Sequence, residues 1–581
     1  MKSKIMALAG LGLVTSLGVA ACGSGSSSSS SGASGVSYDA ASTGVVNPST
    51  HKGGTLNFGM AGDVDSTDPG NTYLALSVDF DRLYVRPLTT YASKPGQAGG
   101  TIVPDLAAGL GVPSADMKTW TFKIKKGIKY EDGTEVKAAD VKYAVSRTLD
   151  RGVLGNGPSY FTQLLIDGST YKGPYKDKNQ ADFKGVTTPD DYTVVFHLNA
   201  AFPEFNYVVA FGQTAPVPQA KDTGAQYALH PMSTGPYMWK GNYTPGKGGT
   251  LVRNPNWDAS TDPNRKQLPN TINFTAGMKQ EELDARLIAG TMDVDANGTG
   301  VSDAARQQIL TNPKLKANAD DPYSGFSWYL PIDTEVIPNV NCRRAIIDGA
   351  DRDAMWRAYG AQYGGEMSTS LMPPNISGRQ PSTLYPVKPG DHGDVAKAKA
   401  DLVACGKPNG FAVNIGFRSE RPKEQATALA LQQSLAKVGI QLTLKGMPAT
   451  TYTTSQFGSH TFDKSNNIGL GTYGWAADWP SGYGFLNALT SSSAIVDSGN
   501  SNVTMLKDPT VDAAWKQVVT LTDQAAREKL YNQVDNTLLE QAGVLPNVYA
   551  KSLDYRSPHL TNVLVQGYYG MYDYANLGVT K

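Results

Sequence analysis

Apolar side chains recur along this chain with two periods, which predict strands where they alternate and helices where they lie three or four apart. Residues 119–124 alternate apolar and polar side chains, as a half-buried strand does. A turn at Asp132-Gly133 follows, and apolar side chains then take helical spacing over 136–149. We expect this strand, turn and helix to pack together as one unit.

The clearest helical pattern lies at 424–438, where four apolar side chains share one face. Gly439 follows it, and glycine is common just beyond the end of a helix. Residues 440–444 then alternate as a strand. Because a helix that leads directly into a strand is typical of α/β proteins, the predicted fold class is α/β.

The same two periods predict most of the other elements. We expect strands at 53–58, 193–198 and 292–294 and around Met238 and Leu251, and helices at 281–289, 341–350, 353–359, 396–403 and within 512–541. The closing segment 549–574 is rich in Tyr and predicts strands and loops. A chain of 581 residues has material for several domains.

One segment, 472–486, places five aromatic residues around a single carboxylate. If its first half is extended, Tyr473, Trp475 and Trp479 share one face and Asp478 points from the other. A buried carboxylate needs a cationic or multiply donating partner, which a ligand can supply. One interpretation is a binding site with aromatic walls. The alternative is that both Trp side chains are core and Asp478 caps the following turn.

The N-terminus predicts export and membrane attachment. Two lysines precede an apolar stretch that is too short to span a bilayer, so residues 1–21 are predicted to be a signal peptide. The end of this segment, Val19-Ala20-Ala21-Cys22, resembles the bacterial lipobox, in which the cysteine is lipidated. Residues 22–50 are predicted to be a flexible Gly/Ser linker. An ordinary signal peptide with an incidental cysteine is the alternative. We expect an extracytoplasmic protein, lipid-anchored to the outer face of the cell membrane.

Two cysteines remain in the exported part of the chain, Cys342 and Cys405. An even number of cysteines in an oxidising compartment favours a disulfide. Two buried thiols are the alternative. Metal ligation is disfavoured because neither cysteine has a second Cys or a His at ligand spacing.

Charge and motifs exclude several classes of function. The 52 basic residues equal the 52 acidic ones, and no Lys/Arg run indicates a nucleic-acid site. The sequence lacks H-E-x-x-H and G-x-x-x-x-G-K-[ST], which excludes that class of zinc protease and a P-loop ATPase subunit. An S-x-x-K spacing at 434–437 falls inside the amphipathic helix and lacks the partner motifs of a serine hydrolase. We expect no enzyme activity, cofactor or metal site.

Nine motifs together carry a resemblance to a known family. They are GGTLNFGMAGDVDSTDP (53–69), KTWTFKIKKGIKYEDGTEVKAADVKYAVSR (118–147), STGPY (233–237), LVRNPNW (251–257), RLIAGTMDV (286–294), NCRRAIIDGADRDAM (341–355), AKAKADLVACG (396–406), LALQQSLAKVGIQLTL (429–444) and YGWAADW (473–479). In this order they resemble the extracellular solute-binding proteins of the peptide/nickel class, family 5, of ABC transporters. The resemblance covers nearly all of 51–581.

The resemblance implies a bilobal, clamshell-like fold of the periplasmic-binding-protein type with an extra subdomain, as in the large peptide-binding members. Motif positions then divide the chain. The first lobe is expected at 51–95, 225–320 and 546–581, the extra subdomain at 96–224, and the second lobe at 321–545. A solute bound between the lobes stabilises the closed form, which would dock on the permease subunits in the membrane.

The resemblance also implies the site. In peptide-binding members the acidic residue of the GW-x-x-D segment receives the α-ammonium of the peptide, and that position here is Asp478. Trp475, Trp479, Tyr483 and Tyr473 are the expected wall residues. The run after Asp478 lacks the second carboxylate that many peptide binders have, which leaves a less polar pocket.

We therefore expect a monomeric substrate-binding lipoprotein of an ABC importer that captures oligopeptides. The alternatives within the same fold are a non-peptide solute, such as a sugar, a metal chelate or a siderophore-like molecule, and a role in sensing peptides.

Overall fold

The computed structural model describes residues 37–177, 179, 182–497 and 499–580. Most of this part of the chain is organised around four sheets of three strands or more. The predicted signal peptide 1–21, Cys22 and the Gly/Ser run up to residue 36 lie outside the described residues. Residues Val36–Lys581 form one compact unit.

The first sheet has the strand order β11-β1-β10-β9-β8. Its strands are β1 (Thr55–Gly59), β8 (Tyr237–Trp239), β9 (Gly248–Arg253), β10 (Thr271–Thr275) and β11 (Val294–Asp295). β1 pairs in parallel with β10 and β11, and its side chains Leu56 and Phe58 are fully buried. The predicted alternation at 53–58 thus points its apolar side into a core.

The second sheet has the order β4-β5-β7-β6. Its strands are β4 (Val112–Pro113), β5 (Thr119–Lys123), β6 (Val186–Asp190) and β7 (Thr193–His197). Trp120 and Phe122 of β5 are buried in one cluster with Val141 and Val145 of helix α2 (Ala138–Arg147). The strand, turn and helix predicted from 119–149 therefore form one packing unit.

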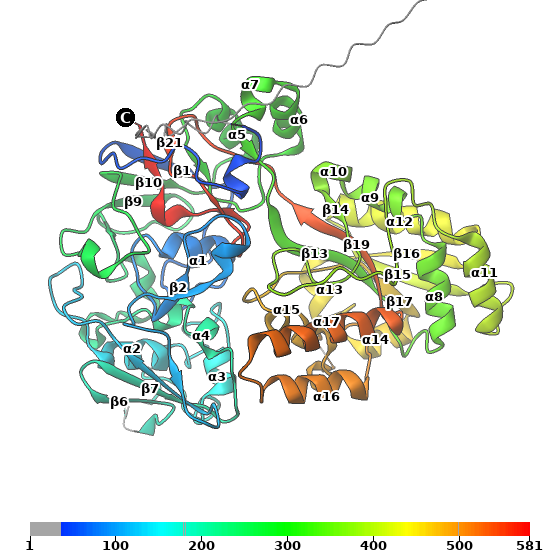
Figure 1. Cartoon of the computed structure of the whole chain (residues 1–581), viewed down its shortest axis with the longest axis horizontal. Helices are drawn as coiled ribbons and strands as arrows, with labels where there is room; N and C mark the ends of the chain where they lie inside the picture. The colour runs from blue at the N-terminus through cyan, green and yellow to red at the C-terminus, as the bar shows by residue number, and fades with distance from the viewer. Residues whose placement is uncertain (1–36, 178, 180–181, 498, 581) are drawn as a thin grey trace, which may run out of the picture. The chain divides into compact units, whose positions relative to one another are not determined.

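The third sheet, β14-β19-β13-β18, is antiparallel, and the fourth, β16-β15-β17, is parallel. Their strands are β13 (Tyr323–Pro331), β14 (Gly365–Met367), β18 (Tyr473–Trp475), β19 (Val544–Lys551), β15 (Ala412–Arg418), β16 (Gln441–Met447) and β17 (Ile468–Gly471). Helix α12 (Pro422–Ala436) connects β15 to β16 as a βαβ crossover. The strong helical pattern at 424–438 thus covers a parallel sheet (Figure 1).

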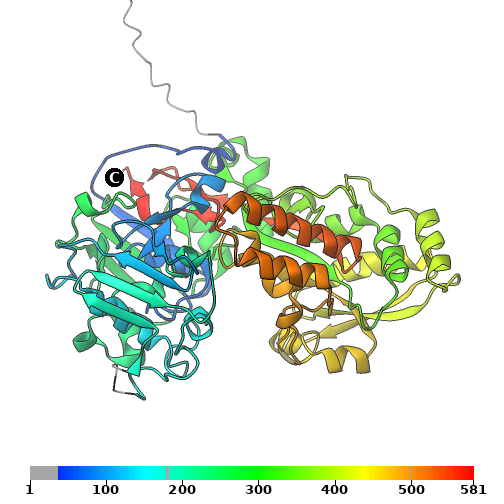
Figure 2. The same cartoon turned by 60° about the horizontal axis from the view of Figure 1, so that its bottom comes forward.

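The remaining elements surround these sheets. The helices are α1 (Ala75–Asp81), α3 (Tyr160–Leu164), α4 (Phe205–Val208), α5 (Gln280–Ile288), α6 (Asp303–Thr311), α7 (Pro313–Lys316), α8 (Val340–Gly349), α9 (Arg352–Tyr359), α10 (Ala361–Gly364), α11 (Val395–Ala404), α13 (Ala449–Ser455), α14 (His460–Ser465), α15 (Gly482–Thr490), α16 (Pro509–Val518) and α17 (Gln524–Glu540). The short strands are β2 (Thr89–Tyr91), β3 (Ile102–Pro104), β12 (Ala319–Asp320), β20 (Asp554–Tyr555), β21 (Leu560–Thr561), β22 (Val565–Gln566), β23 (Met571–Tyr572) and β24 (Gly578–Val579). Helices α16 and α17 lie side by side in both views (Figures 1 and 2). None of the helices within the described residues has the length and apolar character that a membrane crossing requires.

The structure corrects two of the expected boundaries. The linker predicted over 22–50 is wrong for its C-terminal part, because Ala41 and Val46 are buried and Val46 bridges to Val563. Apolar side chains after the Gly/Ser run anchor this segment. The boundary expected between 545 and 546 lies inside β19, which pairs with β13 along its length as far as Lys551. The pairing has two register shifts but reaches Lys551, so the chain leaves this sheet only after Lys551.

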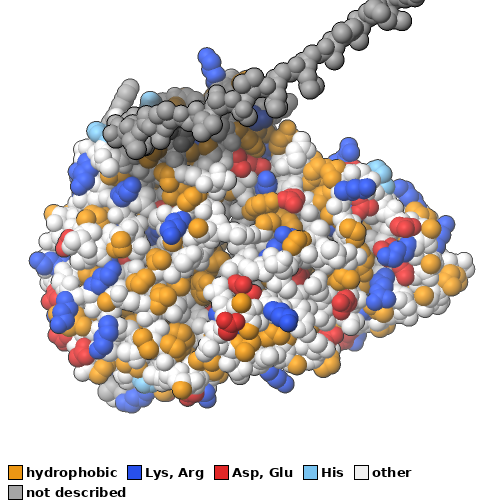
Figure 3. Space-filling view, in the orientation of Figure 1, with side chains coloured by type: hydrophobic (Ala, Val, Ile, Leu, Met, Phe, Trp, Pro, Cys, Tyr) orange, Lys and Arg blue, Asp and Glu red, His pale blue; other side chains and the backbone are white. Residues whose placement is uncertain are grey.

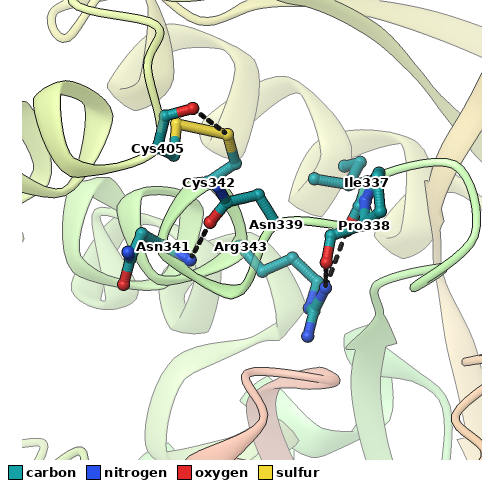
Figure 4. The surroundings of a disulfide bond; sticks show 7 residues. All are labelled: Ile337, Pro338, Asn339, Asn341, Cys342, Arg343 and Cys405. Carbon is teal, nitrogen blue, oxygen red and sulfur yellow. Dashed lines mark hydrogen bonds between the residues drawn. A yellow bond between two sulfur atoms is a disulfide. The ribbon is translucent and has the colours of Figure 1, made fainter.

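Cys342 and Cys405 form a disulfide bond that joins α8 to the end of α11 (Figure 4). Their Cα atoms lie 5.3 Å apart, within the range of unstrained disulfides. Cys342 is buried in the core beneath the fourth sheet. The bond fixes two helices that pack on each other in that core.

On the face shown in Figure 3, acidic and basic side chains are interspersed, as the balanced composition suggests.

A buried carboxyl group without hydrogen bonds lies on α14. Asp463 is fully buried, and neither of its carboxyl oxygens has a hydrogen-bond partner. Burial, together with the nearby Asp333, raises the pKa of Asp463 to about 9. The folded protein therefore holds a proton there that the unfolded chain releases above its ordinary pKa near 4. Stability is expected to fall as the pH rises from about 4 to about 9.

We expect the Asp463→Asn variant not to lose stability in this way as the pH rises. Relative to the wild type, the free energy of unfolding of the variant should rise by up to roughly 1.4 kcal/mol per pH unit between pH 5 and 8, because the amide cannot ionise. Urea denaturation at pH 5, 6.5 and 8 measures this difference. Glu540→Gln, which changes an exposed carboxylate, is the control. A difference that does not grow with pH would contradict the prediction.

Candidate functional site

Asp478 lies in the loop between β18 and α15. The strand ends at Trp475, and the helix begins at Gly482. Ser481 caps this helix, since its Oγ accepts a hydrogen bond from the N–H of Gly484 at 3.1 Å. The backbone N–H of Asp478 donates to the carbonyl of Gly484 at 3.3 Å. The interpretation of Asp478 as the cap is therefore wrong, and its carboxylate is available for other contacts.

Three tyrosines converge on Asp478 from distant parts of the chain. The hydroxyl of Tyr73 donates to one carboxylate oxygen and that of Tyr160 to the other. The hydroxyl of Tyr568 donates to the backbone carbonyl of Asp478 at 2.7 Å. Tyr73 lies just before α1, and Tyr160 begins α3, so the site joins the surroundings of the first two sheets to the loop after β18.

The charge of Asp478 has no cationic partner among the ion pairs between described residues. Burial raises its pKa, and the hydrogen bonds from Tyr160 and Tyr73 oppose that rise. Arg151 lines the same cavity but donates to the carbonyls of Gly155 and Pro158. A partly buried carboxylate that is held by neutral donors favours a cationic group in its cavity.

This cavity has a volume of about 410 Å³. Tyr73, Tyr160, Asp478, Trp479 and Tyr483 contribute to its wall. The rings of Tyr160 and Trp479 meet edge to face at 5.1 Å, and those of Trp479 and Tyr483 stack at 6.3 Å. An aromatic cavity of this size with one carboxylate suits part of a small organic ligand that carries a positive charge.

The three aromatic residues predicted to share one face do not all do so. Tyr473 and Trp475 pack on the core of the third sheet, whereas Trp479 lies in the core of the second sheet and is 2% exposed. The prediction is wrong because the backbone leaves the strand after Trp475, so alternation does not continue to Trp479. Trp479 and Tyr483 line the cavity of Asp478, but Tyr473 and Trp475 do not.

Sequence reasoning missed Tyr73 and Tyr160. They lie 405 and 318 positions from Asp478, and no spacing or local pattern connects them to it. The only local signal was that each follows a loop rich in Gly, Pro and Asn or Asp. Such loops often carry binding residues but do not identify a partner.

A second cavity, of about 540 Å³, has the opposite charge character. Arg306, Arg357 and Lys423 contribute to its wall, together with the single carboxylate Asp303. Two of these basic side chains are already ion-paired, Arg306 with Asp303 and Arg357 with Asp353. Over the described residues, no three His, Cys, Asp or Glu side chains are grouped so that they could hold a metal ion.

Comparisons with known proteins agree on one class, the bacterial extracytoplasmic solute-binding proteins. Residues 101–497 match the family described as bacterial extracellular solute-binding proteins, family 5 middle. The periplasmic oligopeptide-binding protein OppA of Escherichia coli K12 is 24% identical over 471 residues, which cover 78% of this chain and 80% of OppA. The probable D,D-dipeptide-binding periplasmic protein DdpA of the same organism is 26% identical over 504 residues, 84% of this chain and 87% of DdpA.

A solved structure extends the comparison to nearly the whole chain. Clavulanic acid biosynthesis oligopeptide binding protein 2 is 38% identical, with a TM-score of 0.89 over 94% of this chain and 99% of that protein. The fold and the site thus define a solute-binding protein. The chain belongs to the bacterial extracellular solute-binding proteins of family 5. The family and the bilobal α/β fold predicted from the sequence are confirmed.

Proposed function

We propose that this protein binds oligopeptides and delivers them to the permease of an ABC importer. The observation that carries the proposal is the Asp478 carboxylate, held by Tyr73 and Tyr160 in a cavity and without a cationic partner among the described ion pairs. Relatives whose names specify oligopeptides or dipeptides support it. A transport role of this kind needs no catalytic residue or cofactor.

The geometry suits the free amino end of a peptide. An ammonium group has three N–H donors, and the two oxygens of Asp478 are acceptors. Each phenol oxygen of Tyr73 and Tyr160 can also accept a hydrogen bond while it donates to the carboxylate. Trp479 and Tyr483 then form an apolar wall for the first side chain. Tyr473 is left out of the proposed contacts because it is buried in the third-sheet core.

We assign the lobes accordingly. The first lobe takes 51–95, 225–320 and the chain after Lys551, the extra subdomain takes 96–224, and the second lobe takes 321–551, which includes all of β19. A peptide that contacts both Tyr73 and Asp478 bridges two lobes, so it stabilises the closed form over the open one. The protein acts as a monomer that presents this closed form to the permease.

Identification of the bound solute tests the function. The protein is purified without denaturation, and the molecule released on denaturation is analysed by mass spectrometry. Peptides with a free amino end are expected. A sugar, a metal chelate or a siderophore-like molecule as the consistent solute would contradict the proposal and would leave the family assignment intact.

We further propose that the mature protein is anchored through a lipid on Cys22, because the four residues 19–22 resemble a lipobox. Cys22→Ser is expected to leave the protein unprocessed or to release it from the membrane, since serine cannot form the thioether to lipid. Cell fractionation and the mass of the N-terminal peptide measure this. Membrane retention of a mature, lipid-bearing variant would contradict the anchor.

A further inference from the structure

Glu204 is a buried carboxylate of the extra subdomain, and it accepts hydrogen bonds from the loop that contains Asp478. It follows β7 and directly precedes α4, and it is 4% exposed. Its partners Trp479, Ser481 and Tyr531 lie 275 to 327 positions further along the chain. The contact is therefore purely tertiary and joins the extra subdomain to the second lobe.

The carboxylate of Glu204 accepts three hydrogen bonds from these partners. One oxygen accepts from the indole Nε1 of Trp479 and from the Oγ of Ser481, both at 2.6 Å. The other oxygen accepts from the hydroxyl of Tyr531 at 2.8 Å. The Nε of Arg527 lies 3.8 Å from this second oxygen and compensates the buried charge. Only a carboxylate offers two acceptor oxygens to three such donors.

Two of these bonds hold residues that follow Asp478 in the same loop, Trp479 and Ser481. Trp479 directly follows Asp478, and its ring packs edge to face against Tyr160, whose hydroxyl donates to Asp478. Ser481 donates to Glu204 while it caps α15, so it fixes the end of the same loop. A shift of Trp479 would therefore change the contact between Tyr160 and Asp478.

We propose that Glu204 is a positioning residue for solute recognition. It holds Trp479 and Ser481 so that the Asp478 carboxylate faces the cavity beside Tyr160, and it couples the extra subdomain to the ammonium site. This assignment rests on the proposed function of Asp478. It explains why Trp479, a residue predicted to be a cavity wall, is also anchored in the core of the second sheet.

The first test needs no solute. Hydrogen–deuterium exchange of the unliganded protein is compared for the wild type, Glu204→Gln and Glu131→Gln. The glutamine at 204 removes the negative charge that strengthens the hydrogen bonds from Trp479 and Ser481, so backbone exchange in 477–484 is expected to rise about tenfold. Glu131 is the matched control, because it is a largely buried carboxylate of the same subdomain that bonds to His230 and the backbone of Ser233 instead. Unchanged exchange in 477–484 of the Glu204 variant would overturn the proposal.

The second test separates positioning from a general structural role. Isothermal titration with trialanine is performed for Glu204→Gln in the wild-type and Asp478→Ala backgrounds. We expect about tenfold weaker binding in the first background and less than a twofold change in the second, because Glu204 acts through Asp478. Equal losses in both backgrounds, or no loss in the first, would overturn the positioning role.

The two proposals fail in different ways. If wild-type protein does not bind trialanine while exchange at 477–484 rises in Glu204→Gln, the peptide function fails. The claim that Glu204 holds the loop of Asp478 in place then stands. If wild-type protein binds trialanine with an affinity that depends on Asp478 but not on Glu204, the peptide function stands and the positioning role fails.

Discussion

Asp478→Ala is expected to weaken the binding of peptides with a free amino end by about 2–4 kcal/mol, which is roughly 30- to 1,000-fold in Kd. The truncation leaves the ammonium of the peptide buried without its counter-charge, and it also leaves the hydroxyls of Tyr73 and Tyr160 without their acceptor. An alanine in this loop does not disturb the cap of α15, which Ser481 provides. The loss should therefore appear in affinity rather than in folding.

Titration calorimetry with trialanine and with N-acetyl-trialanine measures this effect. The acetylated peptide has no ammonium, so wild-type protein should bind it about as weakly as the variant binds trialanine. Glu366→Ala is a matched control, because Glu366 also accepts a tyrosine hydroxyl, from Tyr323, but lies outside the wall of the cavity. Equal affinity of wild-type protein for both peptides would refute the role of Asp478.

The raised pKa of Asp478 adds a pH dependence to this result. Because burial raises the pKa, the unliganded site takes up a proton at a higher pH than an ordinary aspartate does. Binding of an ammonium needs the ionised carboxylate, so affinity should fall as the pH falls through this raised pKa. In Asp478→Ala the affinity for trialanine should lose this dependence.

Among the substitutions proposed for this protein, loss of the disulfide is expected to lower the free energy of unfolding most. Cys342 and Cys405 are 63 positions apart, and in the chain-entropy account closing a loop of that size stabilises the fold by about 4 kcal/mol. The double variant Cys342→Ser, Cys405→Ser should lower the free energy of unfolding by about this amount. The bond lies in the fourth-sheet core, away from the cavity of Asp478, so trialanine affinity should not change.

Denaturation of wild-type protein with and without reductant gives an independent measure of the same quantity. The double variant should be insensitive to reductant, while reduced wild-type protein should approach it in stability. Thiol reagents should label Cys342 and Cys405 only after reduction. Labelling of the native, unreduced protein at either position would contradict the bond.

The sequence predicted elements well where a single local pattern was sufficient. The helix predicted at 424–438 is α12, and the strand predicted at 119–124 is β5, because each buries one continuous apolar face. Prediction failed where a pattern ended without a local signal. The alternation from Tyr473 stops at Trp475, whereas the next Pro or Gly in the segment, Pro480, comes five positions later. The packed segment at 40–46 and the full length of β19 were likewise misjudged, since their partners lie far away in the chain.

The sequence by itself thus determined the α/β class and the family, because short-range periodicity and ordered motifs carry that information, and it singled out Asp478 as a candidate ligand contact. Tertiary structure alone decided what surrounds this carboxylate. Tyr73, Tyr160 and Glu204 reach the Asp478 loop across separations of 405, 318 and 275 positions. A buried charge must satisfy its hydrogen bonds wherever the fold brings donors to it, and no local pattern records which distant side chains those are.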